Sequence, residues 1–323
     1  MERALEPPIV AAKTRDANWS LGAAFVVMVV VFVVGPFAVY PVFLMKTLCF
    51  ALFACAFNLL IGYGGLASFG HALFFGWASY VTAYAAKAWG WPPELAIVGG
   101  TVVAALLGFV TGGLAIRRQG IYFAMITLAL AQMMYFFALQ AKFTGGEDGI
   151  QGVPRGRLLG LFDLSHEMTM YLFILVVVLA GFLFIFRIIN SPFGEVLKAI
   201  RENEPRTVSL GYKTERYKLV AFVLSATLAG VAGSLNALVF QLASLTDVHW
   251  TMSGDVVLMT LVGGLGTVFG PVVGAFLIVA MQNYFASFGQ WVLVIQGAIF
   301  VACVLVFRRG IVGELASALR IKL

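Results

Sequence analysis

Residues 254–284 read GDVVLMTLVGGLGTVFGPVVGAFLIVAMQNY. The run is almost wholly apolar, yet it is much longer than the roughly 20 residues with which a helix crosses a bilayer. Its middle contains five residues that interrupt helices: Gly263, Gly264, Gly266, Gly270 and Pro271. We therefore predict two membrane-crossing helices with a break near residues 263–270.

The rest of the chain has the same apolar character. Of its 323 residues, 61% are hydrophobic and 11% are charged, and the mean hydropathy is +0.97, whereas about a quarter of the residues of a soluble domain are charged. A bilayer about 30 Å thick can accommodate this surface, but a single soluble core cannot. Further apolar runs of spanning length occur at about 21–41, 43–62, 71–88, 95–116, 120–141, 169–189, 218–241 and 290–307. The sequence predicts an all-α, polytopic integral membrane protein with about ten transmembrane segments.

The basic residues divide unevenly between the two sides of this arrangement. Sixteen of the 21 Lys and Arg fall on one side: three before the first run, two at positions 117 and 118, seven in 187–218 and four after residue 307. Because cytoplasmic segments are rich in Lys and Arg, we expect both termini in the cytoplasm. The predicted organisation is a cytoplasmic tail at 1–20, a transmembrane domain at 21–307 with a cytoplasmic loop at 190–216 and an outer loop at 142–168, and a cytoplasmic tail at 308–323.

Several classes of site are excluded by the residues present. The net charge of +6 comes from scattered basic residues, so no nucleic-acid surface is expected. The three cysteines lie in apolar runs and make no disulfide framework. The nearest string to a phosphate-binding loop, GYKT at 211–214, lacks the upstream glycine, and no Cys or His spacing suits a metal. We expect no catalytic residue, no metal and no cofactor.

Two glycine-rich turns resemble each other. GGLASFG occupies 64–70 and GGLGTVFG occupies 263–270, and each lies between two apolar segments. Such a repeat fits a transporter built from two duplicated halves, whose substrate pathway runs along glycine-interrupted segments. Alternatively, glycine-rich turns recur in membrane proteins simply because they allow helices to pack closely. The candidate pathway or hinge residues are Gly64, Gly65, Ser68, Gly70, His71, Gly263, Gly264, Gly266 and Gly270.

A short amphipathic helix is predicted in the loop 190–216. Ser191 can cap it and Pro192 suits its first position. Phe193, Val196, Leu197 and Ile200 then follow at helical spacing. This apolar face is too short to span a membrane, so it is expected on the membrane surface or against a partner.

The apolar segments contain few ionisable residues that could relay protons or ions. Asp255 is the main candidate, near the end of a segment. This scarcity favours an external energy source over proton coupling.

Several stretches together resemble one family. They are GYGGLASFGHALFFGWASY at 62–80, RRQGIYFAMITLALAQ at 117–132, FTGGEDGIQGVP at 143–154, the long run 191–235, LVGGLGTVFGPVVGA at 261–275 and FRRGIVG at 307–313. In this order and spacing the chain resembles the LivM-type permease subunit of branched-chain amino-acid ABC importers.

The resemblance implies an inner-membrane importer with several partners. These are a second, LivH-type permease subunit, two cytoplasmic ATP-binding subunits and a periplasmic substrate-binding protein, with membrane lipid around the spans. It implies that the loop docks into an ATPase through the residues Phe193, Leu197, Ile200, Arg201, Glu202, Glu204 and Gly211. The sequence Pro205-Arg206-Thr207 departs from the small residues usual there, which affects the docking geometry.

Other readings of the same pattern stay open. A permease for urea or short amides has a similar sequence, and a secondary carrier or channel would transport without ATPase partners. A membrane enzyme would require paired histidines or clustered carboxylates, which this chain lacks.

Overall fold

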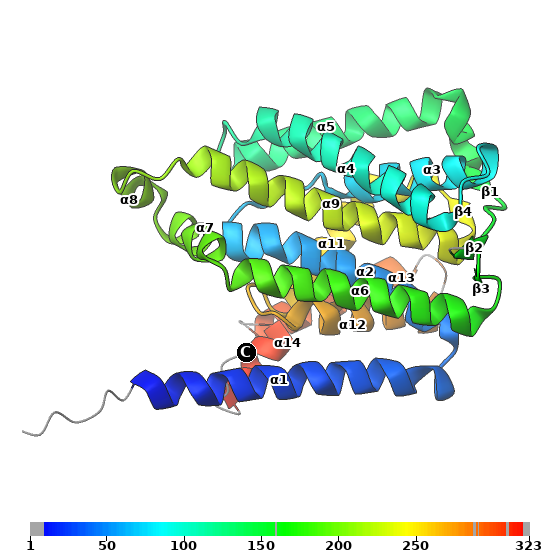
Figure 1. Cartoon of the computed structure of the whole chain (residues 1–323). Coiled ribbons are helices and arrows are strands. Elements are labelled where there is room, and N and C mark those ends of the chain that lie inside the picture. Colours follow the sequence, from blue (N-terminus) through cyan, green and yellow to red (C-terminus); the bar gives the residue numbers. More distant parts are fainter. Residues whose placement is uncertain (1–9, 159, 287–288, 290, 308–309, 319–323) are drawn as a thin grey trace, which may run out of the picture.

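The structure is a computed structural model that describes residues 10–158, 160–286, 289, 291–307 and 310–318. It is a bundle of helices that run along a common direction (Figure 1). The helices are α1 (Val10–Val34), α2 (Pro41–Asn58), α3 (His71–Ala88), α4 (Pro93–Ala115), α5 (Ile121–Gln140), α6 (Glu167–Ile189), α7 (Pro192–Glu202), α8 (Glu204–Ser209), α9 (Thr214–Phe240), α10 (Leu245–Val248), α11 (Trp250–Gly263), α12 (Gly270–Tyr284), α13 (Trp291–Val306) and α14 (Gly310–Ala318). The all-α prediction is confirmed.

Short elements join these helices. A single π-helical turn, η2 (Leu59–Tyr63), extends α2, and 3₁₀ turns occur at η1 (Gly35–Phe37), η3 (Lys142–Thr144) and η4 (Gly146–Asp148). The strands are β1 (Ile150–Gln151), β2 (Arg157–Leu158), β3 (Phe162–Asp163) and β4 (Leu242–Ala243). β1 pairs with β4 and β2 with β3, both antiparallel.

The long apolar run at 254–284 is broken where its glycines predict. α11 ends at Gly263 and α12 begins at Gly270. Between them, Gly264 has φ 126° and Gly266 has φ 74°, a region that residues with a Cβ rarely adopt. The predicted break between two helices is confirmed, and we call α11 and α12 the hairpin.

The two helices of this hairpin approach each other through glycine. A Cβ at Gly274 would overlap the carbonyl oxygen of Met259, and a Cβ at Gly263 would overlap the backbone of Gly270. These glycines therefore let two backbones meet, which is how small residues pack helices in membranes.

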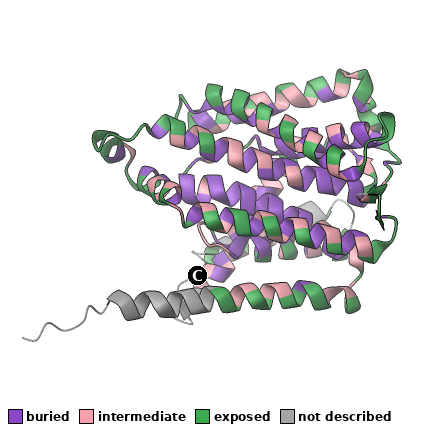
Figure 2. Cartoon of the chain, in the orientation of Figure 1, coloured by how far each residue is buried: buried purple, intermediate pink, exposed green. Residues whose placement is uncertain are grey.

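The centre of the bundle is made by α2, α3 and α9, most of whose residues are buried. In α2 with its extension, 89% of the most apolar window is buried, whereas the corresponding share of α5 is 22%. Figure 2 shows the same contrast between the buried interior helices and α5 at the top of the view. The exposed apolar faces of the outer helices suit lipid or a second membrane subunit.

Five helices in the described part of the chain are long and apolar enough to cross a membrane. They are Pro41–Tyr63, Pro93–Ala115, Ile121–Gln140, Glu167–Ile189 and Thr214–Phe240. Shorter apolar helices lie at Gly22–Phe37, Gly270–Tyr284 and Val294–Cys303. The chain is therefore a multi-pass membrane protein, and each of the predicted apolar runs contains a helix.

The two ends of the chain differ from simple tails. α1 begins at Val10, inside the segment 1–20 predicted as a tail, and α14 occupies part of 308–323. Residues 1–9, Arg308, Arg309 and 319–323 lie outside the described residues.

The two ends of the bundle carry different structures. α7 and α8 project from one end, and the loop 142–168 with its short strands covers the other (Figure 1). This loop is fixed to the bundle by side chains: Arg155 donates to the carbonyl oxygens of Leu238 and Val239, and Lys87 donates to that of Gln151 at 2.7 Å. We call these the α8 end and the strand end.

Candidate coupling site

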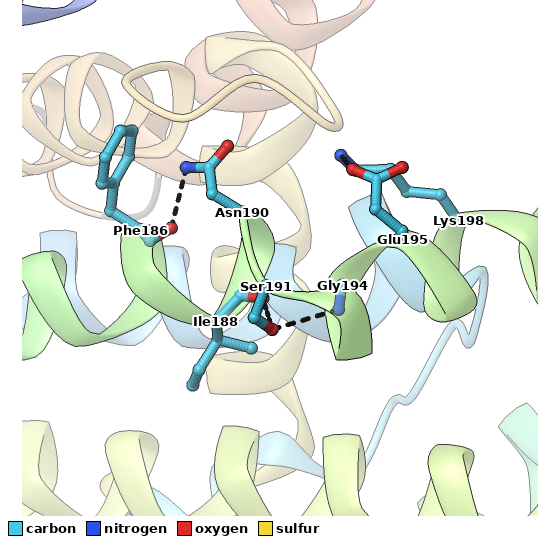
Figure 3. A network of polar contacts seen from close by, with 7 residues as sticks. All are labelled: Phe186, Ile188, Asn190, Ser191, Gly194, Glu195 and Lys198. Atoms are coloured by element: carbon cyan, nitrogen blue, oxygen red, sulfur yellow. Dashed lines mark hydrogen bonds and ion pairs between the residues drawn. The ribbon is translucent and has the colours of Figure 1, made fainter.

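The turn between α6 and α7 is built by local side-chain hydrogen bonds, which Figure 3 shows. Ser191 caps α7: its Oγ accepts from the backbone N–H of Gly194 at 3.4 Å and donates to the carbonyl oxygen of Ile188 at 2.6 Å. Asn190 donates to the carbonyl oxygen of Phe186 at 2.9 Å. Because these bonds satisfy groups at both helix ends, the direction of α7 is fixed relative to α6.

The apolar face of α7 points toward the bundle. Leu197 is fully buried and Ile200 is 3% exposed, and the Phe193 ring stacks on Tyr217 of α9 with centroids 5.7 Å apart. The amphipathic helix is as predicted, but the sequence pattern placed this face on the membrane surface or against a partner. In the structure these three side chains support the loop from within the subunit.

The exposed apolar residues of the loop lie instead at its tip. Val208 is 52% exposed, Leu210 is 70% exposed and Tyr212 is 43% exposed. Val208 lies in the last turn of α8, and Leu210 and Tyr212 follow that helix. Asn203 caps α8 by accepting from the backbone N–H of Arg206 at 3.0 Å. Gly211, with φ 90°, turns the chain after α8. These three side chains form what we call the tip.

Glu204 joins α8 to the beginning of α9. Its carboxylate accepts from Lys218 Nζ at 2.5 Å and from the Thr214 hydroxyl at 3.1 Å. The Lys218 side chain is only 5% exposed, and a buried ammonium group without its counter-ion is strongly unfavourable. The pair therefore holds the tip rigidly to α9, a helix of the bundle centre.

Replacing Glu204 by Gln is expected to destabilise the protein by about 1–3 kcal/mol, because the Lys218 ammonium group loses its carboxylate. The control is Glu195→Gln, which removes the exposed ion pair with Lys198 at 2.8 Å and should change stability by about 0–1 kcal/mol. Thermal unfolding of the purified assembly in detergent measures both variants. Equal unfolding midpoints for the two variants would show that the Glu204–Lys218 pair stabilises the fold no more than the exposed pair does.

Arg201, at the end of α7, contacts both glycine-rich turns. Its guanidinium group donates to the carbonyl oxygen of Gly62. A Cβ at Gly65 would lie 3.1 Å from Arg201 Cγ, and a Cβ at Gly266 would lie 3.3 Å from Arg201 Nη1. Larger residues at these glycines would therefore crowd the arginine.

Asn58, the last residue of α2, binds the second of these turns. Its side chain donates to the carbonyl oxygen of Thr267 at 2.8 Å and accepts from the backbone N–H of Gly266 at 3.0 Å. Beside this junction an open pocket of about 460 Å³ is lined by Tyr63, Lys198, Arg201, Glu202 and Gly266. The two turns are thus neighbours at the α8 end, and α7 lies against both.

The remaining predicted residues of the first turn have packing positions. Ser68 is buried and accepts from the backbone N–H of Gly70 at 3.3 Å. A Cβ at Gly70 would lie 2.5 Å from the carbonyl oxygen of Thr127 in α5. His71 is fully buried, with Nε2 2.8 Å from the Ser225 hydroxyl. The His71 ring is also surrounded by three aromatic rings, those of Phe57, Phe74 and Phe222.

The structure therefore separates the predicted hinge residues into two groups. Gly65 and Gly266 lie at the junction with Arg201, whereas Gly263 and Gly270 form the close approach within the hairpin. Gly64 is buried next to the junction, and Gly264 supplies the sharp turn after α11.

Two residues of this junction were not predicted as site residues. Asn58 is a lone amide near the end of an otherwise apolar segment, and Tyr63 directly precedes the first turn. A buried polar side chain in a membrane helix usually has a specific hydrogen-bond partner. The partner of Asn58 is Thr267, 209 positions away along the chain, so the local sequence does not identify it.

The comparisons with known proteins agree on one family. Residues 39–304 match the family described as "Branched-chain amino acid transport system / permease component". The chain is 26% identical over 299 residues to the high-affinity branched-chain amino acid transport system permease protein LivM of Escherichia coli K12, covering 85% of this chain and 70% of that protein.

Two archaeal proteins are also similar. The probable branched-chain amino acid transport permease protein LivM of Methanocaldococcus jannaschii is 28% identical over 183 residues, covering 54% of this chain and 51% of that protein. The probable permease protein LivH of the same organism is 26% identical over 259 residues, covering 73% and 79%. No solved structure matches the chain. With the family match spanning most of the bundle, the chain belongs to the family of permease components of branched-chain amino acid transport systems.

Proposed function

We propose that this chain is one of two different permease subunits of an ABC importer in a bacterial inner membrane. It carries branched-chain amino acids inward, using ATP that two cytoplasmic partner subunits hydrolyse, after a periplasmic binding protein delivers the substrate. The family membership and the similarity to both LivM and LivH proteins support a paired permease.

The single observation that supports transport driven by partner ATPase subunits is the exposed tip. Val208, Leu210 and Tyr212 expose apolar surface on a segment that projects from the bundle (Figure 1). Arg206 and Lys213 lie beside them, and charged groups there favour a water-facing position. A projecting apolar group rimmed by charge is typical of a protein interface.

Two rigid connections lead from the tip into the membrane bundle. One is the Glu204–Lys218 pair, which joins α8 to α9. The other is Arg201, which joins the end of α7 to the junction of the two glycine-rich turns. A displacement of the tip by an ATPase would therefore move α9 and the α11–α12 hairpin together, which is the rigid-body motion that alternating access requires.

Reconstituted uptake tests this function. The chain is assembled in proteoliposomes with its second permease subunit, the two ATPase subunits and the binding protein. Radiolabelled leucine is expected to accumulate only with ATP on the ATPase side, and urea is expected not to accumulate. Urea uptake without leucine uptake would assign the chain to the amide importers, and accumulation without ATP would make it a secondary carrier.

A further inference from the structure

A polar cavity of about 230 Å³ lies at the strand end, opposite to the tip. Its walls come from α2, the end of α9, β4, α10, α11 and α12, and include Lys46, Asn236, Asp247 and Asp255. One water molecule needs only about 10–15 Å³ of such a volume, so the pocket has room for a ligand much larger than water. It can hold a molecule of the size of an amino acid.

The cavity carries charged groups of both signs. Lys46 enters from the second turn of α2, with Nζ 5.8 Å from the centre of the Phe50 ring. Asp247 and Asp255 enter from α10 and α11. Among the described residues, no carboxylate lies within the 4.0 Å of an ion pair from Lys46. Lys46 and the two aspartates therefore line one pocket without forming a direct ion pair.

The carboxylate of Asp255 is positioned by neutral donors. Gln282 of α12 donates to one of its oxygens and Gln296 of α13 donates to the other, both at 3.2 Å. These amides hold the carboxylate without neutralising it. Buried ionisable side chains usually serve a specific purpose, so a lysine and two aspartates that line one pocket at the strand end call for an explanation.

Asn236 gives an independent indication of a ligand. It lines the cavity and is only 5% exposed, yet its side-chain oxygen has no hydrogen-bond partner among the residues that the structure describes. A buried polar atom without a partner is unfavourable. A ligand with a hydrogen-bond donor would satisfy this oxygen.

The rest of the lining is mixed: Ser244, Thr246 and Gln282 are polar, and four side chains are apolar. The apolar side chains are those of Phe50, Phe240, Leu242 and Met252, and such side chains suit an aliphatic group. We propose that this cavity binds a zwitterionic α-amino acid with an apolar side chain, its carboxylate toward Lys46 and its ammonium group toward Asp247 and Asp255. The site rests on the proposed function and adds to it a substrate-binding step within the membrane subunit itself.

The site is tested by equilibrium binding, not by transport. The purified importer, without ATP and without the binding protein, is titrated with radiolabelled leucine. The same titration uses leucine methyl ester, which lacks the carboxylate, and 4-methylpentanoate, which lacks the ammonium group. Leucine is expected to bind saturably, and each analogue is expected to bind about tenfold more weakly or worse.

Three variants locate the binding. Asp255→Asn and Lys46→Met remove one charge each with little change of size, and each should weaken leucine binding by about tenfold or more. Asn236→Ala keeps both charges and should also weaken binding, which guards against a variant that fails to fold. The controls are Asp148→Asn and Lys142→Met, which change charges at the exposed surface of the strand end, outside the cavity.

The outcomes separate the site from the proposed function. If leucine binding is unchanged in all three cavity variants while ATP-driven uptake persists, the site is overturned and the importer function stands. If the ester binds as tightly as leucine, the cavity is a cation site and the zwitterion proposal is overturned. If leucine binds and the cavity variants abolish this binding although no ATP-driven uptake is found, the site stands and the importer function fails.

Discussion

Copurification of the ATPase subunits is expected to fall by about tenfold or more when Val208 and Leu210 are both replaced by Asp. The two side chains are 52% and 70% exposed, so the folded bundle does not need them, whereas an apolar interface at the tip would have to bury two carboxylates. The measurement is a pull-down of the solubilised importer on a tag carried by this chain, with quantitation of the ATPase subunits.

The matched control for the tip is Leu161→Asp. Leu161 is 80% exposed at the strand end, so it adds an acidic group to an equally accessible apolar position on the other side of the bundle. Its ATPase yield should equal that of the wild type. Normal ATPase yield in the tip variant would mean that the partner binds elsewhere.

A second large effect is expected in the hairpin. Replacing Gly274 by Ala should lower stability by roughly 1–3 kcal/mol or more, because the added Cβ would overlap the Met259 carbonyl oxygen and a backbone cannot yield as a side chain can. The measurement is the thermal midpoint and the yield of monodisperse protein in detergent.

Gly254 provides the control within the same hairpin. A Cβ at Gly254 would have no neighbour within 4 Å, and alanine is the better helix former by up to about 1 kcal/mol. Gly254→Ala should therefore leave the midpoint unchanged or raise it. If both variants were destabilised equally, the close approach of Gly274 to the Met259 backbone would not explain the effect of Gly274→Ala.

Much of the fold could be predicted because the bilayer imposes simple rules. Length and apolar character located the helices, and glycine with proline located the break between α11 and α12. The beginning of α7 was predictable because Ser191 and Pro192 act locally. Local signals of this kind depend on neighbouring residues only.

The candidate site was predicted less completely because its contacts are not local. Helical spacing identified the apolar face of α7 but could not show what covers it, and Leu197 is buried by its own subunit. The similarity of the two glycine-rich turns did not imply that Arg201 would contact both of them, or that Asn58 would bind the second. The predicted duplication of the two halves stays a prediction.

The cavity could not be predicted from the sequence either, because its residues come from separate helices. Asp255 stands out in the sequence as an ionisable residue near a segment end, whereas nothing near Lys46 in the sequence indicates a site. Only the packing of α2 against α11 and α12 brings them to one cavity.

ATP-driven accumulation of leucine by proteoliposomes tests most directly whether the ATPase subunits drive transport through their contact with the tip. The wild-type importer should concentrate leucine above the outside level when ATP is supplied, and the importer with Asp at positions 208 and 210 should reach only the passive level. Undiminished accumulation by that variant, or accumulation by this chain in vesicles without any ATPase subunit, would contradict the account.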